Sequence, residues 1–289
     1  MNHNVATEEL IAQKRARLAR PPRKEHWRFV QSLVGGWGHW RTFRNLETFC
    51  SFIGYPRSGH TLIGSLLDAH PQVAIADELD ALRFIQAGFG RRQVFYLMMR
   101  NARNFAADGR ERTGYVYQVP RQWQGRCENL RVIGDKFGGV TEMRLRFYPE
   151  LLESLAGRLQ LKIKFVHVVR NPYDIISTLH LRQDHTLEGA AARFFVLCEA
   201  VAWIKNKMPE QVIDVRHEDF LREPKSMLAR LCAFVDIDAS EEYLDACSSI
   251  VFRSPHQSRK DIAWPDDLLG AIAEDMKQFD FLDGYSFDS

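Results

Sequence analysis

Residues 49–61 read FCSFIGYPRSGHT, an apolar run followed by a loop with two glycines. The apolar run over 49–53 is typical of a strand, and the apolar side chains within 62–67 fall on one face of a helix. The sequence therefore predicts a strand, a loop and a helix in succession. The first N–H groups of a helix lack partners within it, and the helix dipole is positive there, so the loop is a candidate anion site.

The spacing of this loop sharpens the prediction. Gly54, Gly59 and Thr61 reproduce the glycine and hydroxyl positions of the nucleotide-binding pattern G-x-x-x-x-G-K-[S/T]. His60 replaces the lysine that reaches the β- and γ-phosphates of a triphosphate, which argues against triphosphate chemistry. Arg57 supplies a cation inside the loop instead, and its planar guanidinium suits oxyanions.

A second strand-to-helix junction has similar features. Residues 161–169 form the clearest predicted strand, ending in a nearly continuous apolar run typical of a strand buried on both faces. Arg170 follows, then Asn171, a favourable N-cap, and Pro172, a favourable first helical residue. The sequence thus predicts a second anion site at Arg170.

Two further predicted strands end in charged residues. Residues 73–76 lead to Asp77 and Glu78, and residues 130–134 lead to Lys136. The carboxyl ends of strands in open α/β sheets are where ligands bind. The alternatives are that the two carboxylates complement a helix dipole and that Lys136 is a solvated lysine in a turn.

Composition excludes several classes of protein. The chain has 289 residues, 45% of them hydrophobic and 26% charged, with a net charge of +2. This is ordinary for a soluble globular protein and argues against a surface that coats nucleic acid. Five cysteines without a C-x-x-C pair indicate neither a zinc site nor a disulfide framework. No apolar stretch reaches the ~18 residues of a membrane span, and no signal-peptide core is present at the start, so we expect a reducing cytoplasm.

Residues 1–45 are interpreted as a basic N-terminal extension whose aromatic side chains pack on the main domain. A turn at 35–38 is expected to end it. A role in binding a membrane surface or a partner is the alternative. Its basic and aromatic residues are Lys14, Arg15, Arg17, Arg20, Arg23, Lys24, Trp27, Phe29, Trp37 and Trp40. Residues 80–126, rich in aromatic and basic side chains, are expected to form helices and a loop that cover the sheet edge and frame an acceptor pocket.

The loop sequence, Tyr55-Pro-Arg-Ser-Gly-x-Thr-Leu62, resembles the 5′-phosphosulfate loop of the sulfotransferases, enzymes that use 3′-phosphoadenylyl sulfate (PAPS). Arg170, with a hydroxyl residue eight positions later, is similar to their 3′-phosphate motif. Thr178 matches that offset, and the adjacent Ser177 is the alternative.

The resemblance implies an α/β fold of three layers, with a central parallel sheet between helices and a single domain over 46–289. It also implies PAPS as co-substrate, no metal, and a hydroxyl-bearing acceptor. The residues that it assigns to the nucleotide are Arg57, Ser58, Gly59, His60, Thr61, Leu62, Arg170, Ser177, Thr178, Ser258, Arg259 and Lys260. The last three come from a basic loop over 254–260, where the family's own pattern is incomplete.

The chain is most similar to the tyrosylprotein-sulfotransferase arrangement, in which the loop, an Asp-Ala-His-Pro stretch at 68–71 and an acidic residue follow one another. This resemblance implies that Glu78 is the catalytic base and that Lys136 is its partner. A glutamate with an ordinary pKa of about 4.3 is a weak base for an alcohol, so we expect Glu78 in a pocket without water. Asp80 stands where that family has an arginine for acidic peptides, which favours a small-molecule, lipid, carrier-bound or glycan acceptor.

Two other functions remain open from the sequence. One is a P-loop kinase or NTPase, which would need ATP and Mg²⁺. The other is a nucleotide-sensing or scaffold module without catalysis, in which the basic N-terminal extension would be the partner surface.

Overall fold

The computed structural model describes residues 11–16, 18–19, 25–112, 114–183, 186–252 and 256–289. The expectations placed on Arg17, Arg20, Arg23, Lys24 and Ser254 lie outside these ranges.

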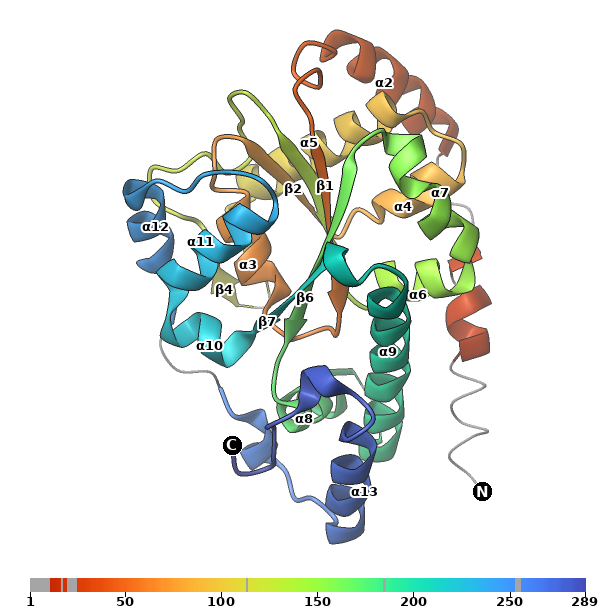
Figure 1. The fold of residues 1–289 in the computed structure, drawn as a ribbon, viewed down its shortest axis with the longest axis vertical. Coiled ribbons are helices and arrows are strands. Elements are labelled where there is room, and N and C mark those ends of the chain that lie inside the picture. The colour runs from red at the N-terminus through yellow and green to blue at the C-terminus, as the bar shows by residue number, and fades with distance from the viewer. Residues whose placement is uncertain (1–10, 17, 20–24, 113, 184–185, 253–255) are drawn as a thin grey trace.

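The centre of the fold is a five-stranded parallel sheet in the order β2-β5-β1-β6-β7 (Figure 1). Its strands are β1 (Thr48–Gly54), β2 (Val73–Asp77), β5 (Val132–Lys136), β6 (Lys162–Val169) and β7 (Val212–Arg216). The central strand β1 has β5 on one side and β6 on the other; the chain passes from β1 to β2 beyond β5 and later from β5 across β1 to β6, so the direction of the connections reverses beside β1. Such a switch point is where open α/β sheets bind ligands.

Helices cover both faces of the sheet, which confirms the predicted three-layer α/β fold. In Figure 1, α3, α10, α11 and α12 lie on one side of the strands, and α4, α6, α7 and α9 lie on the other. The helix bounds are α2 Glu25–Gly38, α3 His60–Leu67, α4 Ala81–Gln86, α5 Arg91–Ala107, α6 Thr141–Phe147, α7 Pro149–Leu159, α8 Pro172–Gln183, α9 Leu187–Lys207, α10 His217–Arg222, α11 Pro224–Phe234, α12 Glu241–Ser248 and α13 Asp266–Met276. Three short 3-10 helices span Pro209–Gln211, Ser258–Asp261 and Asp280–Leu282.

The alternation of side chains along β1 builds two cores. Phe49 and Ile53 belong to the hydrophobic cluster on one face of the sheet, whereas Cys50 and Phe52 belong to the cluster on the other. All four side chains are fully buried. Successive side chains of a strand point to opposite faces, so one apolar strand supports both helical layers.

The stretch from residue 80 to residue 126 forms α4, α5 and a short hairpin, β3 (Glu111–Arg112) and β4 (Tyr115–Val116). Helix α5 packs against the edge strand β2, as expected for a segment that covers the sheet edge. The hairpin was not anticipated, because two strands of two residues leave no period to detect.

The turn predicted at residues 35–38 is wrong, because α2 continues through Gly38. Gly35 and Gly36 face α5: a Cβ atom on Gly35 would lie 2.3 Å from the ring of Tyr96, and one on Gly36 would lie 2.9 Å from the carbonyl oxygen of Arg92. These glycines therefore serve close helix packing rather than chain reversal.

Candidate active site

The loop between β1 and α3 is held in a left-handed backbone conformation at three positions. Gly54 has φ 114°, Arg57 has φ 74° and Gly59 has φ 103°. Arginine adopts such a φ at a cost, which is typical of functional sites. The Ser58 hydroxyl donates to the Tyr55 carbonyl oxygen at 2.9 Å and closes the loop internally. Ser58 can therefore offer a ligand its backbone N–H rather than its hydroxyl.

His60 lies under the loop rather than at its mouth. Its Nε2 is 3.1 Å from the Ile53 carbonyl oxygen, and its ring packs edge-on against Phe52. Burial, together with the charge of Lys136, lowers the pKa of His60 to about 3, so the ring is neutral. The neutral His60 ring therefore cannot supply the positive charge of the missing lysine. Its backbone N–H is the group that His60 can offer a ligand in the loop.

The cation beside the loop comes from the neighbouring strand instead. Lys136 is buried at the carboxyl end of β5, and its Nζ lies 3.2 Å from the Thr61 Oγ1. The same Nζ lies 2.6 Å from Asp77 Oδ1 and 3.1 Å from Glu78 Oε1. A buried ammonium between two carboxylates is held in one position. A cation must be fixed in this way to stabilise the negative charge that develops in a transition state.

Glu78 differs from the expectation of a water-free pocket: its side chain is 43% exposed. Its backbone is left-handed, with φ 53°, and its N–H donates to the Lys136 carbonyl oxygen at 3.0 Å. The chain turns sharply here because the buried Asp135 carboxylate accepts hydrogen bonds from the N–H groups of Leu79 at 3.1 Å and Ala81 at 2.7 Å. The backbone of Glu78 is thus fixed while its carboxylate faces solvent.

Arg112, on the β3 strand of the hairpin, completes the charged cluster. Its Nε lies 2.8 Å from Asp77 Oδ2, and its guanidinium lies 3.9 Å from Glu78 Oε2. The hairpin is anchored by a buried ion pair between Arg110 and Asp68. Sequence reasoning missed Arg112 because no motif surrounds it and its partner is 35 residues away.

Asp80 has a structural partner in the buried Arg144. Asp80 Oδ1 lies 3.0 Å from Nε and Oδ2 lies 2.6 Å from Nη2 of that arginine. The bidentate geometry matches guanidinium to carboxylate. Asp80, which stands in place of the arginine of the tyrosylprotein-type pattern, therefore links the start of α4 to α6 through this ion pair.

The second junction, between β6 and α8, has the predicted cap. Asn171 Oδ1 accepts a hydrogen bond from the N–H of Tyr173 at 3.0 Å, which confirms Asn171 as N-cap. Arg170 Nη1 donates to the carbonyl oxygen of Arg57 at 3.1 Å. The loop after β1 and the junction after β6 therefore meet at one edge of the sheet. The Nε of Arg170 is buried and has no hydrogen-bond partner among the described residues.

The two hydroxyl candidates on α8 differ in accessibility. Ser177 is fully buried and donates to the Tyr173 carbonyl oxygen. Thr178 is partly exposed, and its Oγ1 lies 2.8 Å from Ser258 Oγ. Ser258 belongs to the predicted basic loop, so the structure brings this loop to Thr178 and leaves Ser177 pointing inward.

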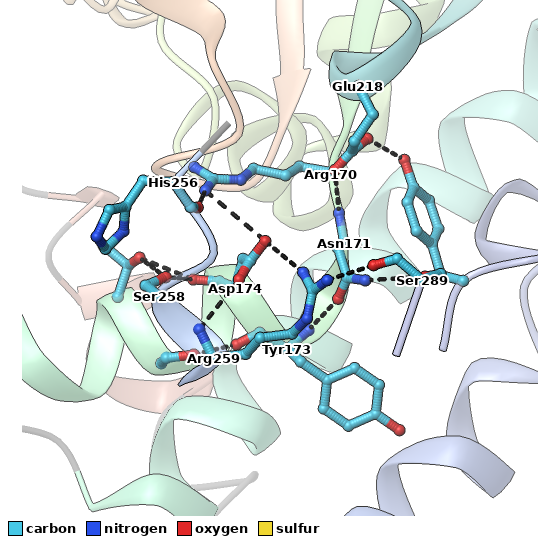
Figure 2. A network of polar contacts seen from close by, with 12 residues as sticks. Arg170, Asn171, Tyr173, Asp174, Glu218, His256, Ser258, Arg259 and Ser289 are labelled. Carbon is cyan, nitrogen blue, oxygen red and sulfur yellow. Dashed lines mark hydrogen bonds and ion pairs between the residues drawn. The ribbon is translucent and has the colours of Figure 1, made fainter. Parts of the chain in front are cut away.

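Asp174 is the centre of a polar network (Figure 2), and its carbonyl oxygen accepts a hydrogen bond from the Thr178 hydroxyl at 2.7 Å. Its carboxylate accepts hydrogen bonds from the Arg259 backbone N–H at 3.0 Å and from Arg259 Nη1 at 2.8 Å. The Arg259 guanidinium also donates to the carbonyl oxygen of Ser289. Arg259 is buried, so the expectation that its side chain contacts the nucleotide does not match its position, whereas Lys260 is exposed.

His217 begins α10 and packs against the loop. A Cβ atom on Gly59 would lie 2.4 Å from its Nδ1, so only glycine fits there. The Nδ1 atom is buried and lacks a hydrogen-bond partner in the described chain. Burial, with the Arg170 charge nearby, lowers the pKa of His217 to about 3. His217 thus supports the loop after β1.

Within the described ranges, no three histidine, cysteine, aspartate or glutamate side chains come together as metal ligands. A search of the same ranges for membrane-crossing segments returns no helix with the necessary length and apolar character.

Comparison with known proteins bears on the family and the fold. Residues 161–241 match the model of the sulfotransferase family, a range that includes Arg170 but not the loop at Arg57. A sulfotransferase domain from the curacin biosynthetic pathway is 18% identical, with 81% of this chain and 98% of that chain covered and a TM-score of 0.50. Sulfotransferase STF9 from Mycobacterium avium is 12% identical, with coverages of 86% and 81% and a TM-score of 0.50. No curated protein matches the chain.

The match over residues 161–241 is to the family that the sequence resembles at its two loop motifs, and it covers the second of them. The two solved structures share the fold.

Proposed function

We propose that the protein transfers the sulfuryl group of PAPS to an acceptor hydroxyl without a metal. The observation that carries this proposal is the contact between the two half-sites, in which Arg170 Nη1 donates to the Arg57 carbonyl oxygen at 3.1 Å. One ligand with phosphates at both ends of an adenosine can therefore touch both junctions. A triphosphate uses only the first of them.

The donor groups of the two half-sites fit the two ends of PAPS. The Arg57 guanidinium, the Thr61 hydroxyl and the loop N–H groups over 58–62 would hold the phosphosulfate. Arg170, with its unpaired buried Nε, and the partly exposed Thr178 would hold the 3′-phosphate. Both clusters offer hydrogen-bond donors to oxyanions, so they complement the charge of the nucleotide.

In the proposed reaction the acceptor oxygen attacks sulfur in line with the bridging oxygen. A new S–O bond forms, the bond from sulfur to the bridging oxygen breaks, and adenosine 3′,5′-bisphosphate leaves. Lys136 stabilises the charge that grows on the bridging oxygen, as fixed cations do in phosphoryl transfer. Glu78 accepts the proton of the acceptor hydroxyl.

The exposure of Glu78 defines what the acceptor must contribute. A carboxylate that is 43% exposed and lies 3.1 Å from an ammonium is a weak base. An acceptor seated over Glu78 would displace water from its carboxylate, and a carboxylate excluded from water accepts a proton more readily. We therefore infer that the bound acceptor completes the catalytic base.

A P-loop kinase is the second candidate, because Lys136 Nζ lies 3.2 Å from Thr61 Oγ1, near the place where triphosphate enzymes have a lysine. The amine is paired with two carboxylates, and the junction at Arg170 has no role in that chemistry. These two points favour sulfuryl transfer.

We also propose a reducing compartment for the protein. Its five cysteines are free thiols, and Cys50, Cys198, Cys232 and Cys247 are buried as small apolar side chains.

The direct test is a transfer assay with radiolabelled PAPS in EDTA against alcohols, phenols and glycans. The proposal expects label on at least one hydroxyl class. Binding of adenosine 3′,5′-bisphosphate without transfer to any acceptor would favour a sensor, and transfer of phosphate from ATP with Mg²⁺ would favour the kinase.

A further inference from the structure

Helix α2 carries its large apolar side chains on its outer surface. Trp27, Val30, Val34 and Trp37 recur at intervals of three and four residues and are 68%, 53%, 72% and 77% exposed. Leu33 is exposed next to them, and Trp40 follows just beyond the helix. We call these six residues the α2 apolar face.

The inner side of α2 is made of small residues. Ser32 and Gly36 are buried, and Gly35 lies against the ring of Tyr96 on α5. Gln93 of α5 donates to the Phe29 carbonyl oxygen at 3.2 Å and to the Ser32 hydroxyl at 3.1 Å. The helix is therefore attached to the domain by close backbone packing and polar contacts.

This arrangement is the reverse of an ordinary surface helix, which turns its apolar stripe toward the core. The inner contacts fix the orientation of α2, so the apolar face cannot rotate inward without losing them. A cluster of exposed apolar side chains on one helix indicates a binding surface rather than scattered exposure.

The charges along the α2 apolar face are mostly basic. Residues 26–46 contain Arg28, Arg41 and Arg44 but no aspartate or glutamate, and the acidic residues Glu25 and Glu47 stand at the two ends of this stretch. Among the described residues, no carboxylate lies within 4.0 Å of these three guanidinium groups, whereas many other arginines of the chain are ion-paired. Arg41 lies over the Trp40 ring at 5.5 Å, so cation and aromatic ring share one surface.

We propose that the α2 apolar face docks on the interface of an anionic lipid bilayer. Tryptophan is favoured at the boundary between headgroups and acyl chains, and arginine can bury its stem there while its charge meets lipid phosphate. Helix α2 has Trp, Val and Leu on one face, and apart from Glu25 at its first position the charged residues from 25 to 46 are basic, which is typical of an interfacial helix. This excess of arginine favours an anionic lipid surface over a protein partner of mixed charge.

The position of α2 keeps the candidate active site accessible in this orientation. Figure 1 shows α2 beyond the amino ends of the strands, whereas the loop at Arg57 follows the carboxyl end of β1. The catalytic end of the sheet would therefore face the aqueous phase, where a charged nucleotide is dissolved. Docking would hold the enzyme near the membrane without burying its nucleotide site.

The test is cosedimentation of the full chain with vesicles of phosphatidylcholine alone or with about one-third phosphatidylglycerol. We expect binding to the anionic vesicles and a blue shift of tryptophan fluorescence. The combined variant Trp27→Ser, Val34→Ser, Trp37→Ser should bind at least about tenfold more weakly, because it removes most of the buried apolar area. Leu181→Ser is the matched control: Leu181 is 52% exposed on α8, at the other end of Figure 1, and its removal should leave vesicle binding unchanged.

A second variant separates charge from apolar burial. Arg28→Gln, Arg41→Gln, Arg44→Gln should abolish the preference for anionic over neutral vesicles. Unchanged thermal unfolding and bisphosphate binding would show that both variants fold. Wild-type protein that stays in the supernatant with anionic vesicles, or equal binding by the tryptophan variant, would overturn the proposal. A wild-type dimer in ultracentrifugation that the tryptophan variant dissociates, without vesicle binding, would assign the face to a second copy.

Discussion

The two half-sites of the proposed nucleotide site are built differently. At the β1–α3 loop and the end of β2, the backbone is left-handed at Arg57 and Glu78, and the Glu78 carboxylate is exposed. At the β6–α8 junction, the carboxylate of Asp174 and the guanidinium of Arg259 are buried and form an ion pair. The first half-site has an exposed carboxylate, whereas most polar groups of the second are paired with one another and Arg170 Nε lacks a hydrogen-bond partner among the described residues.

The two half-sites are therefore expected to have different roles, one in turnover and the other in binding and stability. A pre-built network holds a phosphate with little rearrangement, so the β6–α8 junction should contribute affinity and stability together. The half-site at Glu78 lies where bonds change, and it needs the acceptor to complete it. Substitutions at the first half-site should therefore reduce turnover, and those at the second should reduce folding stability or nucleotide affinity.

The largest expected effect is on turnover. Glu78→Gln should lower kcat by about 10²- to 10⁴-fold, because it removes the proposed general base. Its affinity for adenosine 3′,5′-bisphosphate should stay within about twofold, since a half-exposed side chain contributes little to the fold. Steady-state kinetics and calorimetry measure the two quantities. Glu153→Gln on the exposed surface of α7 is the control, and full activity of Glu78→Gln would remove Glu78 from the mechanism.

The largest expected effect on stability is at the polar network around Asp174. Asp174→Asn should reduce the free energy of unfolding by about 3–5 kcal/mol, because it leaves the buried Arg259 charge uncompensated. Asp236→Asn is the control, since Asp236 pairs with the exposed Lys162 at 2.8 Å and should cost less than about 1 kcal/mol. Urea denaturation measures both. Equal losses in the two variants would contradict the distinction between the half-sites.

Nucleotide affinity should respond to Arg170. Arg170→Gln should weaken binding of adenosine 3′,5′-bisphosphate by about 10- to 100-fold, as expected for loss of a charged hydrogen bond. Binding of adenosine 5′-phosphate, which lacks the 3′-phosphate, should change far less. A similar loss for both nucleotides in calorimetry would place Arg170 outside the 3′-phosphate site.

The histidine that supports the loop makes stability depend on pH. Burial and the nearby Arg170 charge lower the pKa of His217 to about 3 in the folded protein. Its ordinary pKa in the unfolded chain is about 6.5. The unfolded state therefore binds the proton first, so the stability that His217 contributes is complete above about pH 6.5 and is lost as the pH falls toward 3.

Between about pH 7.5 and 5.5, this effect should lower the free energy of unfolding by about 1.4 kcal/mol for His217. Over the same interval, the free energy of unfolding of His217→Asn should fall by about 1.4 kcal/mol less than that of the wild type. Urea midpoints at the two pH values measure the difference. An identical pH response in wild type and variant would show that folding does not lower the pKa of His217.

The smallest expected effect distinguishes the two hydroxyls on α8. Thr178→Ala should weaken bisphosphate binding by about 3- to 10-fold through loss of one hydrogen bond. Ser177→Ala should leave affinity unchanged, because the Ser177 side chain is fully buried whereas Thr178 is partly exposed. The reverse result would reassign the phosphate contact to Ser177.

Patterns within short stretches of the sequence predicted the features that depend only on neighbouring residues. The loop at Arg57, the strand before Arg170 and the Asn171 cap follow from glycine spacing, apolar runs and capping preferences. The position of Lys136 at a strand end was also predictable, because parallel strands end at a common edge.

Contacts between distant segments were not predictable. Arg112 reaches Asp77 only because a hairpin folds back over β2, and Arg259 turns inward because Asp174 lies behind it. The exposed tryptophans of α2 were expected to pack on the domain, yet Gly35 and Gly36 occupy that contact instead. In each case the side chain's direction depends on a neighbour that is far away in the sequence.

The most direct measurement is isothermal titration of the wild-type chain with adenosine 3′,5′-bisphosphate in EDTA, repeated with Arg57→Ala and Arg170→Gln. If the two half-sites bind opposite ends of one nucleotide, the wild type binds one equivalent without metal, and each variant weakens that binding. No heat with the bisphosphate, together with Mg²⁺-dependent binding of ATP, would contradict this assignment.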